Sequence, residues 1–288
     1  MKIGINARVE VFGGEEDLFR ALHEAGFDCI DFLAERNPDD NTYAKKILSI
    51  SKRYGIEISQ THLPIWINSS EEEFLSEKFV GSVIKGIYRT AELGVRYAVV
   101  HPYVPQGMER FLMGRPYDYS IYREKNFRLN MEFFGKIAPA AKDAGVVLCI
   151  ENLFAHDLVL GQHVASACSD PAETLAYIEQ LGAPFAACYD TGHHNLHGGD
   201  PEQYIETVGS HIKVMHVNNS FGKELRGFDW HLMPGQGDVD FSVVLGTLHK
   251  IGFDGIFSYE VHLDKDLKTF QLEYLARAAR RLIELYFK

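Results

Sequence analysis

Six successive apolar segments of this 288-residue chain each lead into a residue type that binds metal ions. The segments are short and rich in β-branched and aromatic residues, as buried parallel strands are. A Glu buried in a strand is costly unless it is paired or coordinates a metal. Strands that end in this way indicate one polar pocket, because a closed barrel brings its strand ends to one face. The segment ends carry His62, His101, Glu151, Asp190 with His193, His216 and Glu260, and Asp229 and His231 precede the last segment.

Strand-like and helix-like segments alternate throughout the chain, and this alternation predicts eight β/α pairs. No GxGxxG motif follows the first strand, which disfavours an open, doubly wound sheet. We therefore expect an α/β fold, a single (β/α)8 TIM barrel over residues 1–288, since about 250 residues is typical of such barrels. Strands are expected at 2–8, 29–34, 56–62, 96–103, 146–152, 185–190, 212–219 and 255–261, and helices at 15–27, 41–55, 71–94, 123–145, 170–182, 200–210, 240–253 and 267–287.

Composition narrows the classes of partner. The formal net charge of −11 weighs against a general polyanion binder. The four cysteines are widely spaced without a CxxC pair, and three of them lie in apolar segments, which is typical of buried, reduced thiols in a cytoplasmic protein. The amino terminus begins directly as a strand and lacks a signal-peptide core, and no apolar stretch approaches the roughly 18 residues that span a bilayer. We expect a cytoplasmic protein without a membrane partner, and a homo-oligomer is compatible with the sequence.

Four of the ligand-type residues form a hard, mostly oxygen-based set that suits Mn²⁺ or Mg²⁺ and also accommodates Zn²⁺. These are Glu151, Asp190, His216 and Glu260, on four consecutive predicted strands. His62 and His101 approach Glu151 from the neighbouring strands, either as further metal ligands or as substrate-binding residues. Candidates for a further cluster, or for substrate binding in the case of His193, are His193, Asp229 and His231.

The sequence resembles the xylose isomerase-like TIM-barrel superfamily over essentially its whole length. The motifs that carry the resemblance are THLPIW, VVHPY, IEN, CYDTGHHNLHGGD, HVNN, DWHLMPGQGDVDF and SYEVH. The pattern from Asp229 to Phe241 looks most like the sugar-phosphate isomerase/epimerase branch. In the ketose epimerases of this superfamily, four residues hold one divalent metal and two glutamates among them exchange protons with the substrate. The resemblance thus implies a metal-stabilised enediolate, with Glu151 and Glu260 as the catalytic pair.

The resemblance also implies substrate contacts. His193 matches a residue that holds a substrate oxygen. Those epimerases carry an Arg shortly after the histidine that corresponds to His216, whereas the cations available here are Lys223 and Arg226, at a different spacing. Asp157 lies in the long loop at 153–169 and is a weaker candidate. We expect Trp66 to form part of an apolar wall beside the sugar, with the loop at 104–121 as a lid.

The sequence is also compatible with two other functions. The endonuclease IV-type enzymes of the same superfamily hold three zinc ions with five His, two Asp and two Glu, and residues matching all nine are present here. The loop cations, however, are interleaved with acidic residues, which disfavours contact with duplex phosphates. The third hypothesis is a barrel that binds a sugar without catalysing a reaction. We favour an enzyme acting on a small-molecule sugar, with nucleic acid disfavoured as a partner.

Overall fold

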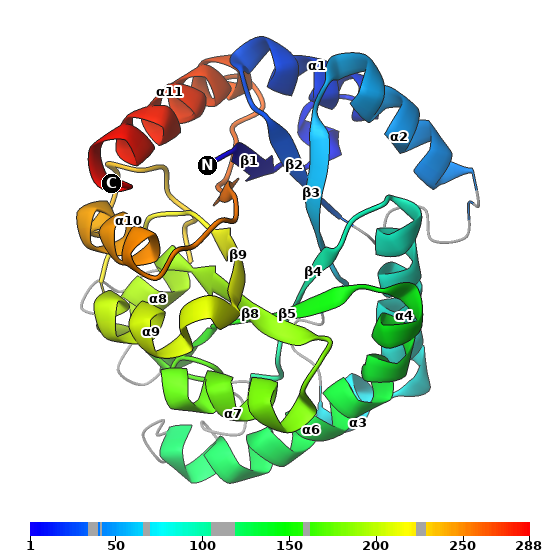
Figure 1. The fold of residues 1–288 in the computed structure, drawn as a ribbon, viewed down its shortest axis with the longest axis vertical. Coiled ribbons are helices and arrows are strands. Elements are labelled where there is room, and N and C mark those ends of the chain that lie inside the picture. The colour runs from blue at the N-terminus through cyan, green and yellow to red at the C-terminus, as the bar shows by residue number, and fades with distance from the viewer. Residues whose placement is uncertain (34–39, 41, 66–69, 105–118, 158–161, 223–228) are drawn as a thin grey trace.

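In the computed structural model the chain forms a single (β/α)8 TIM barrel, with helices surrounding the strands (Figure 1). The structure describes residues 1–33, 40, 42–65, 70–104, 119–157, 162–222 and 229–288. The barrel strands are all parallel and neighbour one another in the order β10, β1, β2, β3, β4, β5, β8, β9. Their bounds are β1 Ile3–Asn6, β2 Cys29–Leu33, β3 Glu57–His62, β4 Tyr97–Val100, β5 Val147–Glu151, β8 Phe185–Asp190, β9 Ile212–His216 and β10 Phe257–Glu260.

The sheet closes between its two end strands, β9 and β10. Val217, directly after β9, forms a parallel bridge with Tyr259. The Val217 amide donates to the carbonyl of Ser258 over 2.7 Å, and the Glu260 amide donates to the carbonyl of Val217 over 3.0 Å. These bonds fix the carboxyl end of β10 beside that of β9, so Glu260 and His216 lie at the same end of the barrel.

The helices pack their apolar faces against the outside of the strands (Figure 1). All eight predicted strands and the helices between them are present. The helices are η1 Val9–Val11, α1 Glu15–Ala25, α2 Tyr43–Tyr54, α3 Glu71–Phe74, α4 Glu77–Glu92, α6 Tyr119–Ala144, α7 Pro171–Leu181, α8 Thr191–His197, α9 Pro201–Val208, η2 Gly209–His211, α10 Phe241–Lys250 and α11 Lys268–Tyr286. Of these described helices, none is long and apolar enough to cross a bilayer.

Three local features differ from the expected elements. The helix expected at 71–94 is divided into α3 and α4, because Ser76 starts a new helix by accepting a hydrogen bond from the Phe79 amide. The loop after β5 contains an antiparallel hairpin of β6 Phe154–Asp157 and β7 Gln162–Ala165. The short helix α8 follows β8 at once, with Asp190 as its N-cap.

The interior of the barrel has an apolar floor beneath the ligand-type residues. Side chains alternate along a strand, so Cys149 shares the inner face of β5 with Glu151, and Cys188 shares that of β8 with Asp190. All four cysteines of the chain are buried and unbridged. The floor consists of Val99, Cys149, Ala186, Cys188 and Val214.

Candidate metal centre

The carboxyl ends of four consecutive strands bring Glu151, Asp190, His216 and Glu260 together. One ligand atom from each of the four lies within 4.8 Å of those of the others. His216 Nδ1 lies 3.2 Å from Glu151 Oε1 and 3.0 Å from Glu260 Oε2. Glu260 is the most accessible member, with 19% of its side chain exposed, whereas the other three are fully buried. The group is therefore open to solvent on the side of β10.

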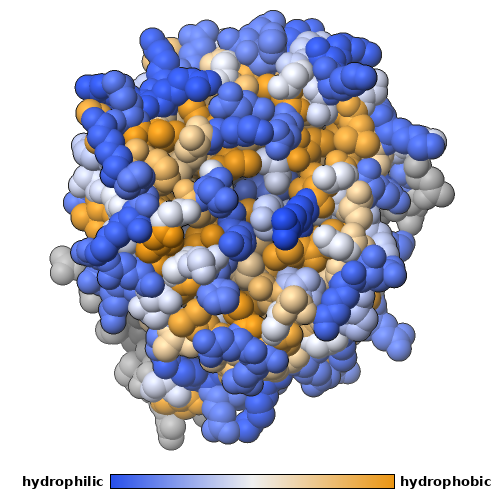
Figure 2. Space-filling view, viewed as in Figure 1, coloured by the Kyte–Doolittle hydropathy of each residue, from blue (hydrophilic) through white to orange (hydrophobic). Residues whose placement is uncertain are grey.

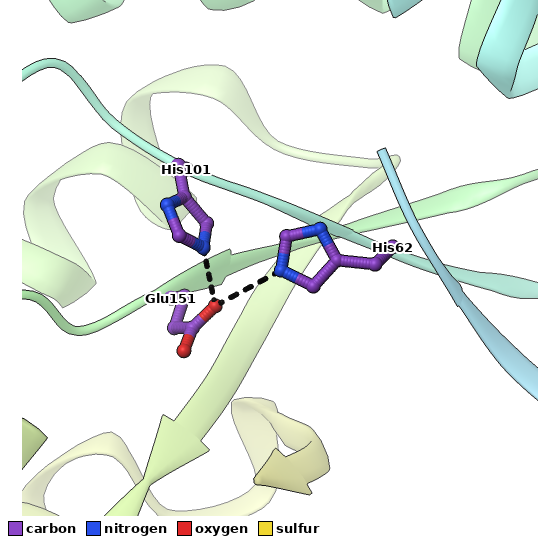
Figure 3. A group of neighbouring side chains, drawn as sticks. All are labelled: His62, His101 and Glu151. Atoms are coloured by element: carbon purple, nitrogen blue, oxygen red, sulfur yellow. Dashed lines mark ion pairs between the residues drawn. The ribbon is translucent and has the colours of Figure 1, made fainter. Parts of the chain in front are cut away.

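Two further histidines face the other carboxylate oxygen of Glu151 (Figure 3). His101 Nε2 lies 2.8 Å from Glu151 Oε2, and His62 Nε2 lies 3.7 Å from the same atom. The rings of His62 and His101 meet edge to face, with 4.9 Å between their centroids. Glu151 is therefore shared between two groups, one through each oxygen.

A third group lies beside the first two. Asp229 Oδ2 sits between two imidazole nitrogens, 3.1 Å from His193 Nε2 and 2.5 Å from His231 Nε2. His193 Nδ1 lies 3.2 Å from Glu151 Oε1, so this group adjoins the four-residue group. The nine ligand-type residues predicted from the sequence thus converge at one end of the barrel in three adjoining groups.

Local backbone structure positions the third group. Asp190 caps α8 by accepting a hydrogen bond from the His193 amide over 2.6 Å, which places the His193 ring over the pocket. Asn219, just after β9, exchanges two backbone hydrogen bonds with Leu232. This pairing holds the segment containing Asp229 and His231 across the barrel mouth.

Close packing explains two of the glycines in the sequence motifs. A Cβ at Gly192 would lie 1.6 Å from the side-chain oxygen of Asn218. A Cβ at Gly237 would lie 2.4 Å from the backbone oxygen of Ser220. Both positions therefore require glycine for the loops around the pocket to approach one another.

Four polar residues that sequence reasoning did not select support the ligand groups. Asp31, on β2, accepts a hydrogen bond from His216 Nε2 over 3.0 Å and another from the Gln60 side-chain amide over 3.0 Å. Asn218 donates to Asp190 Oδ2 over 2.8 Å. Asn152 accepts from the Asp190 backbone amide over 2.7 Å. The signal for Asp31 was a lone carboxylate in the middle of an apolar strand, where burial requires a partner.

The ring nitrogens of the imidazoles are placed like those of metal-bound histidines. In three of them Nδ1 lies near a backbone carbonyl and Nε2 faces a carboxylate of the cluster: His62 with Leu63 at 2.9 Å, His193 with Asn152 at 3.1 Å, and His231 with Glu260 at 2.8 Å. His216 reverses the two nitrogens, since its Nε2 contacts Asp31 and its Nδ1 faces the cluster. Metal-bound histidines typically donate their second ring N–H to such an oxygen.

Several buried polar atoms of the site lack a hydrogen bond within the described part of the chain. Among them is His62 Nε2, which faces Glu151 Oε2 across 3.7 Å. Two ligands of one zinc ion, each about 2.0–2.2 Å from it, can be separated by this distance. The residues therefore fit a divalent cation, and the carboxylate-rich four-residue group suits Mn²⁺ or Mg²⁺ as well as Zn²⁺.

Opposite charges dominate the electrostatics of the cluster. Burial opposes ionisation of Glu260 and Glu151, but His216 lowers the pKa of Glu260 to about 2 and holds that of Glu151 well below its ordinary value. Burial raises the pKa of Asp190 to about 6, against the influence of His193. Burial lowers the pKa of His231, but the hydrogen bond to Asp229 overcomes this and raises it to about 9. The two glutamates are therefore ionised at neutral pH.

Some predicted substrate-binding residues lie outside the described residues: Trp66, Lys223, Arg226 and most of the loop at 104–121. Asp157 ends β6, in the hairpin after β5. Phe154, at the start of the same strand, packs against the His193 ring with 5.2 Å between centroids. Figure 2 shows hydrophilic residues over much of the rim of this face, and apolar residues interspersed with hydrophilic ones toward its middle.

Comparison with models of protein families identifies the family of this chain. The model of the xylose isomerase-like TIM barrel family matches residues 19–285. The chain belongs to this family. Its sequence is 26% identical over 271 residues to an uncharacterized protein of Methanocaldococcus jannaschii, a match that covers 90% of this chain and 83% of the relative. It is 25% identical over 266 residues to L-ribulose 3-epimerase of Mesorhizobium japonicum, covering 90% of this chain and 80% of the relative.

Solved structures of the family share the fold. A D-tagatose 3-epimerase-like protein superimposes with a TM-score of 0.74 at 22% identity, covering 99% of this chain and 98% of that one. The structure of an L-ribulose 3-epimerase gives a TM-score of 0.68 at 21% identity, covering 99% and 94%. Both similarities extend over nearly the whole barrel, so the family fold is intact here from β1 to α11.

Proposed function

We propose that this protein is a divalent-metal-dependent isomerase or epimerase of a small sugar or sugar phosphate, in which Glu151 and Glu260 transfer the proton. The observation that carries the proposal is that two ionised carboxylates, on β5 and β10, approach the same Nδ1 of His216 within one ligand group. The similarity to L-ribulose 3-epimerase and to the ketose 3-epimerase of Arthrobacter globiformis, 27% identical over 127 residues, supports the choice of a sugar substrate.

The four residues of the group, Glu151, Asp190, His216 and Glu260, would hold the cation. A bound divalent cation would polarise the sugar carbonyl and stabilise the negative charge that develops on its oxygen. Asp31 orients His216 by accepting a hydrogen bond from its Nε2, and Asn218 orients Asp190. These supports leave the ligand atoms turned toward the pocket, so little reorganisation accompanies binding.

The proton transfer needs two groups on different sides of the reacting carbon. The low pKa values of Glu151 and Glu260 leave both ionised, so either can accept the proton from carbon. The other glutamate takes a proton from solvent before it returns one to the substrate, and the first releases its proton to solvent afterwards. Return of the proton to the opposite face of the same carbon gives an epimer, and return to the neighbouring carbon gives an aldose–ketose isomer. His193 and His101 line the same pocket and are candidates for binding the substrate hydroxyls.

Solvent exchange provides the test. The Glu260→Gln variant keeps the size of the side chain and one oxygen ligand but removes the base. We expect it to fold and to lose deuterium incorporation from solvent into a sugar chosen from a panel of ketoses, aldoses and their phosphates. The metal content of the purified variant is measured in parallel, so that loss of metal is separated from loss of the base. Undiminished exchange in a metal-loaded variant would remove Glu260 from the mechanism.

A phosphodiester-cleaving enzyme is the second candidate, and one observation favours it. All nine ligand-type residues are present and form three adjoining groups, which is more than a single-metal isomerase needs. A cluster of several zinc ions could activate water for attack on phosphorus. The decisive comparison gives the metal-loaded protein an abasic DNA duplex and, separately, the sugar panel. Nicking at the abasic site without turnover of any sugar would replace the proposed function with this one.

A further inference from the structure

Cys188 lies directly beneath the four-residue ligand group. It occupies the inner face of β8 two residues before Asp190, and its side chain is fully buried. The floor of the barrel contains a second thiol, that of Cys149 on the adjacent strand β5. The two cysteines are therefore alike in burial and surroundings, but they differ in their contacts with the ligand group.

The thiol of Cys188 belongs to a set of three donors. Its Sγ, an imidazole nitrogen of His216 and a carboxylate oxygen of Glu151 all lie within 4.8 Å of one another. Two ligands on one zinc ion are at most about 4.5 Å apart, because Zn–S is about 2.3 Å and Zn–N or Zn–O about 2.0–2.2 Å. The separations in this set are thus close to those of a metal site already.

The two partners of Cys188 in this set are buried as well. Glu151 and His216 are both fully buried, and Glu151 Oε1 lies 3.2 Å from His216 Nδ1. A buried carboxylate is costly unless it is paired or coordinates a cation. The thiol, the carboxylate and the imidazole are all enclosed by the barrel wall, which excludes competing water.

We propose that Cys188 gives the centre a second binding mode, in which a soft divalent cation such as Zn²⁺ or Cd²⁺ is held by the Cys188 thiolate with Glu151 and His216. Soft thiolate ligands select such ions, whereas Mg²⁺ and Mn²⁺ prefer the all-oxygen and imidazole donors above the floor. Formation of the metal–sulfur bond releases the thiol proton to the buffer. Cys188 is thereby a determinant of which metal the centre retains.

The two binding modes exclude one another, because Glu151 and His216 belong to both. A soft ion drawn to Cys188 would occupy the position beneath the proposed catalytic cation and take two of its ligands. The inference rests on the proposed metal-binding function, and it adds that thiophilic ions bind differently from hard ions at the same residues.

Cadmium titration of the full chain tests this proposal. We expect Cd²⁺ to produce the ultraviolet thiolate-to-metal charge-transfer band in the wild-type protein and in Cys149→Ser, and no band in Cys188→Ser. Cys149→Ser is the matched control, because it removes an equally buried thiol from the same floor. The affinity for Cd²⁺ relative to Mg²⁺ should fall at least about tenfold in Cys188→Ser alone, which is about 1.4 kcal/mol. Cys188→Ala replaces the serine variant if the latter fails to fold.

Equilibrium dialysis separates the failure of this inference from the failure of the proposed function. Cd²⁺ that binds to the wild-type protein without a thiolate band overturns the role of Cys188 but leaves the metal centre standing. A band that persists in Cys188→Ser and is lost in Cys149→Ser would identify Cys149 as the ligand, and this result would also overturn the proposed role of Cys188. Binding of neither Cd²⁺ nor Mg²⁺ or Mn²⁺ contradicts the metal centre itself, and with it both proposals.

Discussion

Glu173 is a buried carboxyl group outside the candidate site, and its titration should be visible in the stability of the whole protein. It lies in the first turn of α7, where the Tyr119 hydroxyl donates to its Oε1 over 2.6 Å and the Tyr177 hydroxyl over 3.4 Å. Tyr177 in turn accepts from Asn130, whose side-chain oxygen holds the backbone amide of Tyr103, two residues after His101. The network thus connects α7 with the loop that carries a candidate ligand.

Burial raises the pKa of Glu173 from 4.5 to about 7, although the Tyr119 hydroxyl and Arg123 oppose the shift. The folded protein therefore binds a proton at this carboxyl that the unfolded chain has already released between about pH 4.5 and 7. Stability linked to Glu173 is greatest below pH 4.5 and falls as the pH rises toward 7. Since one pKa unit corresponds to about 1.4 kcal/mol, the folded state loses about 3 kcal/mol from this group above pH 7.

The Glu173→Gln variant removes this titration. The glutamine can still accept the Tyr119 hydrogen bond, and the cost of burying its amide does not depend on pH. We expect the free energy of unfolding of the variant, minus that of the wild type, to be about 2–3 kcal/mol larger at about pH 8 than at about pH 5, because only the wild type loses stability over this range. Urea unfolding at both pH values measures the difference. Glu179→Gln, on the exposed side of the same helix, is the control and should show no such change. An equal effect of Glu173→Gln at both pH values would refute the reasoning.

Three further outcomes follow from the site. Asp31→Asn should weaken Mn²⁺ binding about 10–100-fold in calorimetric titration, because His216 loses the carboxylate that orients it; unchanged affinity would show that His216 needs no such support. Gly192→Ala should destabilise the fold by about 2 kcal/mol or more in urea, since its Cβ would overlap Asn218, whereas Gly81→Ala, with open space on α4, should be neutral or stabilising. Metal binding should weaken as the pH falls below about 9, because the cation must displace the proton that Asp229 stabilises on His231; affinity that is constant from about pH 6 to 9 would argue against His231 as a ligand.

The barrel was predictable because its signals are local and repeated. Each strand is a short apolar run, and each helix has apolar residues at helical spacing, so the order of the elements follows from the sequence. The division between α3 and α4 depends on one serine within an otherwise continuous helical pattern. The hairpin of β6 and β7 depends on pairing between segments that show no clear alternation of apolar and polar residues. Neither feature gives a periodic signal.

The candidate site was predictable for residues at strand ends and less so elsewhere. Parallel strands in a barrel align their carboxyl ends, so the nine ligand-type residues could be expected to meet. Asp31 stands within its strand, and its relation to His216 spans 185 positions in the chain. Asn152 and Asn218 are neutral amides close after Glu151 and His216, and nothing in the sequence marks them as part of the site. Their roles come from three-dimensional neighbours, which no spacing in the sequence encodes.

The position of Glu151 affects how successive metal ions would bind to the centre. Its Oε2 faces His62 and His101, and its Oε1 faces His216 and His193. A cation bound to one oxygen withdraws charge from the carboxylate, which weakens the binding of a second cation to the other oxygen. The same negative carboxylate lies between the two cations and reduces their repulsion. Occupancies at the adjoining groups are therefore thermodynamically linked, and each equilibrium constant depends on the loading of the neighbouring group. Metal uptake by this protein would then deviate from a simple hyperbola, and replacement of Glu151 would alter every step of the isotherm at once.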